Sequence, residues 1–175
     1  MSEQRVDNAC TAELVDGSVI SLRGLRPDDA EDVVSLYETL TDQERYFRFF
    51  AMHPAHLADW AKSLTVPRTG QYSLGAFGAG HLLGVANYVV CTSTPDEAEV
   101  AVVVAHAQHL RGVGTALLRQ LGRIAKDDGI RQFVAEVLWE NHLMLQVLAD
   151  LGWPCTRRLD GSVLHVTVGL TAETH

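Results

Sequence analysis

The sequence predicts one α/β (α+β) domain, a mixed sheet with helices packed on its faces, and three observations support this fold class. The stretch YSLGAF, the turn GAG and the stretch HLLGVANYVV alternate with a period of two, which is typical of an antiparallel hairpin. The nearly all-apolar run EVAVVVA (99–105) is typical of a central strand covered on both faces. Apolar residues at helical spacing then follow a Gly-x-Gly loop at Gly112 and Gly114, which indicates a helix directly after this strand.

The elements before the hairpin follow from local signals. SVISLRGL (18–25) alternates polar and apolar residues as a strand near a sheet edge does. Pro27 opens a helix, because proline fits the first helical turn. The apolar face of this helix is Ala30, Val33, Val34, Tyr37 and Leu40. A second short helix is expected at about 55–64, and the aromatic residues of TDQERYFRFF (41–50) are too dense for an ordinary exposed loop.

The second half of the chain continues the alternation of helices and strands. The helix after the glycine loop is expected to end at Gly129, and RQFVAEVL (131–138) forms a further strand. Asn141 is a good N-cap for a helix that Gly152 closes. A hairpin around 160–161 ends the domain. The predicted order is β-α-α-β-β-β-α-β-α-β-β.

Length and charge limit the classes of partner. The 175 residues are most economically a single domain over 15–170, between polar tails at 1–14 and 171–175. Lys and Arg total 14 against 22 Asp and Glu, a formal charge of −8, so we expect no nucleic-acid surface. An anionic ligand would therefore need a small site of its own, because the protein as a whole is negatively charged.

The cysteines and the absence of long apolar runs indicate the compartment. Cys10, Cys91 and Cys155 are far apart and form no CxxC pair, which is typical of reduced, intracellular thiols. The N-terminus has no signal-peptide core, and no apolar run approaches the ~18 residues of a membrane span. We therefore expect a cytoplasmic protein that does not bind membranes.

The Gly-x-Gly loop has three possible interpretations. A dinucleotide-binding fingerprint requires a small residue where Leu117 stands, and a P-loop requires a Gly-Lys-Ser/Thr tripeptide that does not occur here. A strand, a loop of exposed N–H groups and a helix N-terminus remain, and these suffice to bind a pyrophosphate without a lysine. The alternative is that Gly112 and Gly114 only make a tight strand-to-helix turn.

The stretch EVAVVVAHAQHLRGVGTALLRQL and the later FVAEVLWENHLMLQVLADLGW resemble the Gcn5-related N-acetyltransferase (GNAT) superfamily, over roughly 17–170. More narrowly, DGSVISLRGLRPDDAEDV, RYFRFF and AEVAVVV are similar to the GNAT domains of bacterial Pat-type protein lysine acetyltransferases. The resemblance implies a mostly antiparallel sheet with helices on both faces and a splayed central strand. It also implies acetyl transfer from acetyl-CoA to an amine, with a protein lysine as the preferred acceptor.

The family motif Q/R-x-x-G-x-G/A, which binds the acetyl-CoA pyrophosphate through main-chain amides, maps onto His109, Gly112 and Gly114, and His109 departs from the usual Gln or Arg. The residues implied for the pyrophosphate are His109, Leu110, Arg111, Gly112, Val113, Gly114 and Thr115. For the pantetheine arm they are Val102, Val103, Val104 and Asn141, and a simple N-cap role for Asn141 is an equal alternative.

Acetyl transfer requires a neutral amine, and holding a lysine of pKa ~10.4 neutral at pH 7 costs about 4.6 kcal/mol. Glu99 matches the glutamate that serves as general base in the Pat group, through a water, with Glu97 as the second choice. Either residue could also be a solvated acid at the end of a turn. In many family members a tyrosine acts as the general acid that protonates the departing CoA thiolate, but this chain has Leu148 at that position. Tyr88 or solvent would have to supply the proton instead.

Other patterns are weaker. His53 and His56 have metal-ligand spacing, but no third ligand lies near them in the sequence, so we expect no metal. Arg45, Arg48 and Arg68 favour an acidic acceptor surface. The expected partners are acetyl-CoA and a protein with a target lysine, with a homodimer possible. The alternatives are a small-molecule amine acetyltransferase and a catalytically idle acyl-CoA-binding module.

Overall fold

The computed structural model describes residues 9–49, 56–109 and 111–170, which form one eight-stranded sheet with helices on both faces. The strand order is β1-β2-β3-β4-β5-β6-β8-β7, and every neighbouring pair is antiparallel except β5 and β6. The strands are β1 (Cys10–Glu13), β2 (Val19–Gly24), β3 (Gln71–Gly78), β4 (His81–Val90), β5 (Glu97–Val104), β6 (Gln132–Leu138), β7 (Cys155–Asp160) and β8 (Val163–Gly169). The helices are α1 (Ala30–Glu38), α2 (Asp42–Phe49), α3 (Leu57–Thr65), α4 (Val113–Asp127) and α5 (His142–Leu151).

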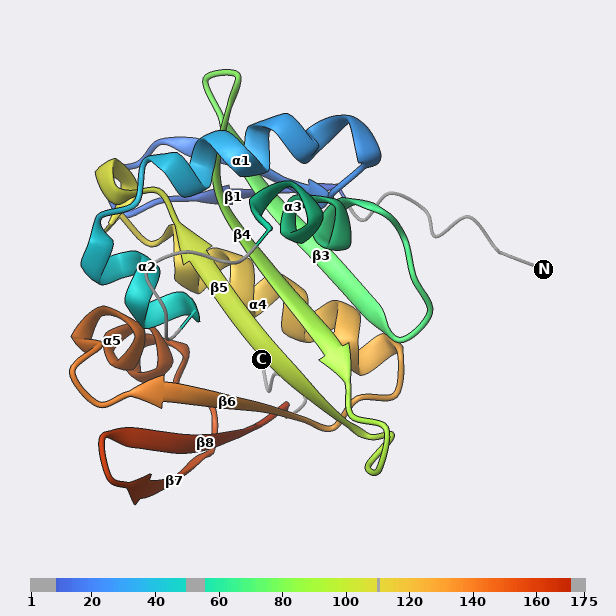
Figure 1. The fold of residues 1–175 in the computed structure, drawn as a ribbon, viewed down its shortest axis with the longest axis vertical. Helices are drawn as coiled ribbons and strands as arrows, with labels where there is room; N and C mark the ends of the chain where they lie inside the picture. The colour runs from blue at the N-terminus through green and yellow to red at the C-terminus, as the bar shows by residue number, and fades with distance from the viewer. Residues whose placement is uncertain (1–8, 50–55, 110, 171–175) are drawn as a thin grey trace.

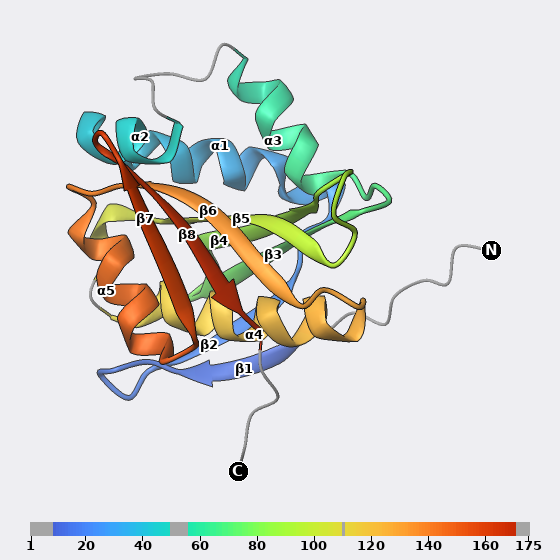
Figure 2. The ribbon, with the colours of Figure 1, turned by 90° about the horizontal axis from the view of Figure 1, so that it is seen from below.

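Two hydrophobic cores hold the helices against the sheet. Figure 2 shows α1, α2 and α3 on one face and α4 and α5 on the other. Leu117, Leu118 and Leu121 of α4 are fully buried in one core, and Val33 of α1 is fully buried in the other. Successive β5 side chains point to opposite faces, and Val102 and Val104 pack against one core while Val103 is buried in the other. The prediction of a central strand covered on both faces is therefore confirmed.

Two elements differ from the sequence predictions. Cys10–Glu13 forms β1, paired with β2, so the residues expected to be an N-terminal tail extend the sheet instead. The aromatic stretch after residue 40 forms α2, which begins with a reciprocal capping box: Thr41 N–H donates to Glu44 Oε2 at 2.8 Å, and Glu44 N–H to Thr41 Oγ1 at 3.2 Å. The following helix begins at Leu57, and residues 50–55 lie outside the described part of the chain.

The sheet opens between β5 and β6. These two strands pair only where Glu97–Glu99 lies beside Gln132–Val134. Beyond that point β5 stays paired with β4 as far as Val104, and β6 stays paired with β8 as far as Leu138. Figure 1 shows β5 and β6 meeting at one end and diverging toward α2 and α5. The splayed central strand that the resemblance implies is present.

None of the helices in the described ranges is long and apolar enough to cross a lipid bilayer. Cys10, Cys91 and Cys155 are free thiols, as their spacing predicted.

An ion pair fixes the connection from β2 into α1. Arg23 Nη1 and Nη2 donate to the two carboxylate oxygens of buried Asp29 at 2.9 and 3.0 Å, and Arg26 N–H donates to Oδ2 at 2.7 Å. The hydrogen bonds from Arg23 lower the pKa of Asp29 further than burial raises it. The charged carboxylate is therefore the form that the folded state prefers.

We predict that Asp29→Asn lowers the free energy of unfolding by about 2 kcal/mol at neutral pH, the usual cost of losing a hydrogen-bonded charge partner. Because folding lowers the pKa of Asp29, this stabilisation is present above the ordinary aspartate pKa and is lost as pH falls through the folded-state value. Urea unfolding of both proteins at about pH 7 and about pH 3 measures this, and the difference should narrow in acid. An equal difference at both pH values would contradict the ion-pair account.

Candidate functional site

A cavity of about 530 Å³ occupies the opening between β5 and β6, a volume within the usual range for small-molecule sites. Residues from both faces of the sheet line it. Phe47 and Arg48 of α2 contribute from one face, and Val113, Gly114 and Val147 of α4 and α5 from the other. The cavity is therefore bordered by helices from both faces of the sheet.

Main-chain groups of β5 point into this opening. Ala105 N–H donates to the carbonyl of Leu83 at 2.9 Å, which directs the main chain of Ala105 toward β4. Because main-chain groups of successive strand residues point to opposite sides, those of Val102 and Val104 face the opening. The position of His109 supports this assignment: its Nε2 lies 3.0 Å from the Val104 carbonyl oxygen, on the side of β5 away from β4. An extended ligand can therefore pair with β5 as a missing strand would.

Val103 differs from Val102 and Val104. It lies two residues before Ala105, so its pair with Val85 is a hydrogen-bonded one, and its main-chain groups are directed at β4 and are not free. The expectation of a free main chain is wrong at this position, because the alternation of the strand allows only every second residue to face the opening. The side chain of Val103 still lines the cavity.

The N-terminus of α4 forms a second wall. Gly112, the N-cap, has a φ of +93°, a conformation that glycine adopts without strain. The first amides of α4 have no partner within the helix, and the helix dipole places partial positive charge there. No acidic residue lies in the first turn. Gly112, Val113, Gly114 and Thr115 all line the cavity, so this wall suits an anion.

One predicted loop residue, Arg111, does not line this wall. Arg111 turns toward the N-terminal segment, where its Nη2 lies 2.8 Å from Asp16 Oδ2 and 2.9 Å from Ser18 Oγ. Its side chain therefore ties the loop to the turn before β2, and it is absent from the cavity lining. Leu110 lies outside the described residues.

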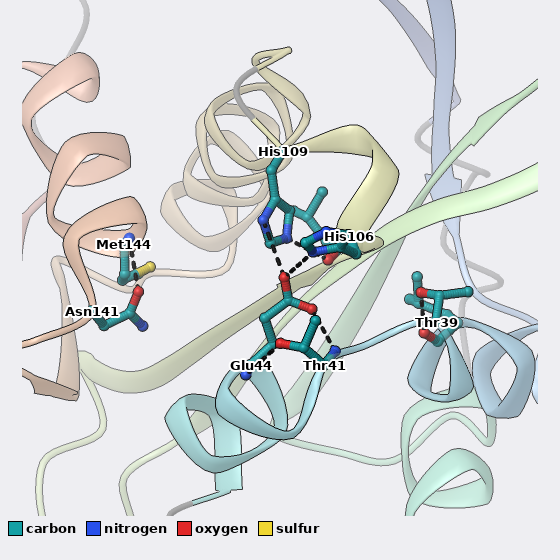
Figure 3. Close-up of polar contacts among 9 residues, drawn as sticks. Thr39, Thr41, Glu44, His106, His109, Asn141 and Met144 are labelled. Atoms are coloured by element: carbon teal, nitrogen blue, oxygen red, sulfur yellow. Dashed lines mark hydrogen bonds and ion pairs between the residues drawn. The ribbon is translucent and has the colours of Figure 1, made fainter.

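Asn141 caps α5 and also faces the cavity. Its Oδ1 accepts a hydrogen bond from Met144 N–H at 3.1 Å, which caps α5 (Figure 3). The residue also lines the cavity. Because the cap uses only the oxygen, the Nδ2 group has two donors to offer a ligand.

Glu99 lies just beyond the cavity. Its side chain is exposed and does not line the cavity, but Ala101, the next residue on the same face of β5, does. Arg48 of α2 is the charged neighbour of Glu99. Burial lowers the pKa of Arg48 to about 10, and the negative charge of Glu99 opposes this shift. Arg48 is therefore a half-buried cation that lines the cavity, and the expectation that it faces an acidic partner protein stays a prediction.

The other candidate acids and bases are engaged elsewhere. Glu97 Oε2 accepts a hydrogen bond from Gln132 Nε2. The Tyr88 hydroxyl lies 2.5 Å from Asp128 Oδ2, and its ring packs in the core 5.9 Å from Phe133, away from the cavity lining. Leu148 is buried. Tyr88 is therefore not positioned to protonate a leaving group in the cavity.

The sequence analysis missed a carboxylate in the cavity wall, that of Glu44. Glu44 of α2 lies between two histidines, with Oε1 2.5 Å from His106 Nδ1 and 3.4 Å from His109 Nδ1 (Figure 3). Burial raises the pKa of Glu44, but the hydrogen bonds from His106 and from the N–H of Thr41 outweigh it, so the pKa lies below its ordinary value. The Thr-x-x-Glu spacing at 41–44, a capping-box signature, was the signal that could have identified this residue.

The sequence matches the acetyltransferase (GNAT) domain family over residues 20–153. The GNAT domain of S. lividans PAT, known from a crystal structure, is 34% identical. That match covers 93% of this chain and 97% of that chain, with a TM-score of 0.84. The chain therefore belongs to the GNAT acetyltransferase family and is an N-acetyltransferase, as the resemblance predicted.

Two further solved structures share the fold at lower identity. YncA of Salmonella typhimurium, solved with its cofactor acetyl-CoA, is 15% identical with a TM-score of 0.69, over 90% of this chain and 98% of that one. A cAMP-binding acyltransferase from Mycobacterium smegmatis is 22% identical with a TM-score of 0.65. That match covers 94% of this chain but 48% of the larger protein, so the chain spans about half of its length.

Proposed function

We propose that this N-acetyltransferase binds acetyl-CoA in the opening between β5 and β6 and transfers the acetyl group to a lysine side chain of a protein. One observation carries the proposal: the cavity is lined from both faces of the sheet and meets the unpaired main-chain side of β5. A thioester can therefore enter from the α4 face and an amine from the α2 face.

The donor is held mainly by main-chain groups. The pyrophosphate lies over the loop and first turn of α4, where His109 and the amides of 112–115 line the cavity. The pantetheine arm pairs with the main chain of Val102 and Val104, and Asn141 Nδ2 donates to it. Arg111 supports the loop from outside through Asp16. Main-chain amides near the phosphates can thus bind the anionic substrate although the chain as a whole is negatively charged.

Glu99 is the general base in this proposal. It lies two residues from Ala101 on the same strand face, about 7 Å along β5, a span that one bridging water can complete. Deprotonating the lysine ammonium allows the nitrogen to attack the thioester carbonyl, and the tetrahedral intermediate then expels the CoA thiolate. Solvent protonates this thiolate, because Tyr88 is bonded to Asp128 in the core.

We predict that Glu99→Gln lowers kcat by about 10² to 10⁴, the usual cost of losing a general base, with little change in acetyl-CoA affinity. The deficit should shrink as pH rises, because the amine then loses its proton unaided. Glu97→Gln is the matched control on the same strand face and should stay within a few-fold of wild type, because Gln132 already engages Glu97. A normal kcat in Glu99→Gln and a large loss in Glu97→Gln would reverse the assignment.

The choice of a lysine acceptor rests on the likeness to the GNAT domain of S. lividans PAT and to the Pat group. Incubation of the protein with labelled acetyl-CoA and a lysate should label protein lysines, identified by mass spectrometry. Aminoglycosides, polyamines and free amino acids should be much poorer acceptors. A small amine that is acetylated far better than any lysate protein would move the assignment to the small-molecule class. Acetyl-CoA binding without any transfer would favour the idle binding module.

A further inference from the structure

Three metal-ligating side chains from two separate parts of the chain converge at the rim of the cavity. Glu44 comes from α2, and His106 and His109 follow β5, with His106 in the short 3-10 turn His106–Gln108. One ligand atom of each lies within 4.8 Å of the others, and Glu44 Oε1 is 2.5 Å from His106 Nδ1 and 3.4 Å from His109 Nδ1. Figure 3 shows the two imidazoles on one side of the carboxylate.

The spacing of these atoms suits a tetrahedral ion. Ligands bound about 2.0–2.1 Å from tetrahedral zinc lie about 3.3 Å from one another. The separation of Glu44 Oε1 and His109 Nδ1 is 3.4 Å, which already matches. The 2.5 Å separation of Glu44 Oε1 and His106 Nδ1 is that of a direct hydrogen bond, and it would lengthen to admit the ion. His106 can make this adjustment because its side chain is 60% exposed.

The second polar atom of His109 and of Glu44, the one that would not bind the ion, has a hydrogen-bond partner that holds the side chain in place. His109 Nε2 lies 3.0 Å from the Val104 carbonyl oxygen, so Nε2 carries the proton and donates it. This arrangement leaves Nδ1 as the ligand atom and fixes the ring, as outer partners of metal-binding histidines do. Glu44 Oε2 accepts from Thr41 N–H at 2.8 Å, which leaves Oε1 for the ion.

We propose that Glu44, His106 and His109 bind a zinc ion at the rim of the cavity, with a fourth coordination position open to the cavity. Two imidazoles and a carboxylate are a typical zinc set when one position stays open. The ion cross-links α2 to the segment between β5 and α4. It therefore joins an element on one face of the sheet to the loop that forms the opposite wall of the cavity. The site stands whether or not the chain acetylates lysine.

The test uses the full, untagged chain and Co²⁺ as a spectroscopic substitute for zinc. We expect one equivalent of Co²⁺ to give the visible absorption bands of four-coordinate cobalt and one equivalent of Zn²⁺ to remove them. Glu44→Gln, His106→Ala and His109→Ala should each abolish the bands. Zinc should also raise the thermal midpoint of the wild type and leave those of the three variants unchanged.

Two control variants test whether cobalt binds at this site and not at other histidines of the chain. His165→Ala removes an imidazole that lies 3.5 Å from Glu136 on the other end of the sheet, and His56→Ala removes one of the HPAH pair. Both variants should keep the wild-type bands. A wild type without four-coordinate bands, or bands that persist in His106→Ala, would overturn the proposal. His106→Ala keeps the test decisive if His109→Ala fails to fold, because His106 is mostly exposed.

Discussion

The parting of β5 from β6 is the constraint on which the rest of the site depends. A strand inside a sheet normally satisfies its main-chain groups on both sides, and an unpaired buried amide or carbonyl costs free energy. Here β5 pairs with β4 over its length but with β6 only at Glu97–Glu99. The Val104 carbonyl accepts from His109 Nε2, and the main-chain groups of Val102 and the amide of Val104 require another partner. A ligand with amides along an extended arm can satisfy them, and this need explains the position of the cavity.

The charges that line this opening differ from the net charge of the chain. The chain carries a formal charge of −8, yet the first turn of α4 contains no acidic residue and offers main-chain amides instead. On the opposite face, half-buried Arg48 lies near Glu99, and its positive charge offsets the carboxylate. The two faces of the opening thus differ in chemistry, since one suits an anion and the other combines a half-buried cation with an exposed carboxylate.

The sequence predicted most elements because their signals are local. The helix from Val113, its termination near Gly129 (φ +87°) and the cap at Asn141 all follow from glycine geometry, capping and apolar spacing. β1 was not predicted, because a four-residue strand carries too little periodicity to distinguish it from a tail. α2 was not predicted, because its aromatic residues obscured the capping box at its start.

The candidate site was predicted in part. The glycine loop and the valines of β5 are contiguous motifs, and they meet at the cavity. The pairing of Val103 with Val85 depends on the register of β4 and β5, which single-residue patterns do not determine. The contact of Glu44 with two histidines more than 60 positions away depends on the tertiary fold. Local sequence patterns therefore could not predict the strand register or the contacts between residues far apart in the chain.

Residue-resolved hydrogen exchange, followed by NMR with and without saturating acetyl-CoA, tests the central claim most directly. The amide protons of Val102 and Val104 should exchange quickly in the free protein and become protected in the complex, because only the ligand pairs with them. The amide protons of Ala101 and Val103 should be protected in both states, because β4 already pairs with them. Unchanged exchange at Val102 and Val104 in the saturated complex would contradict the claim that acetyl-CoA occupies the opening beside β5.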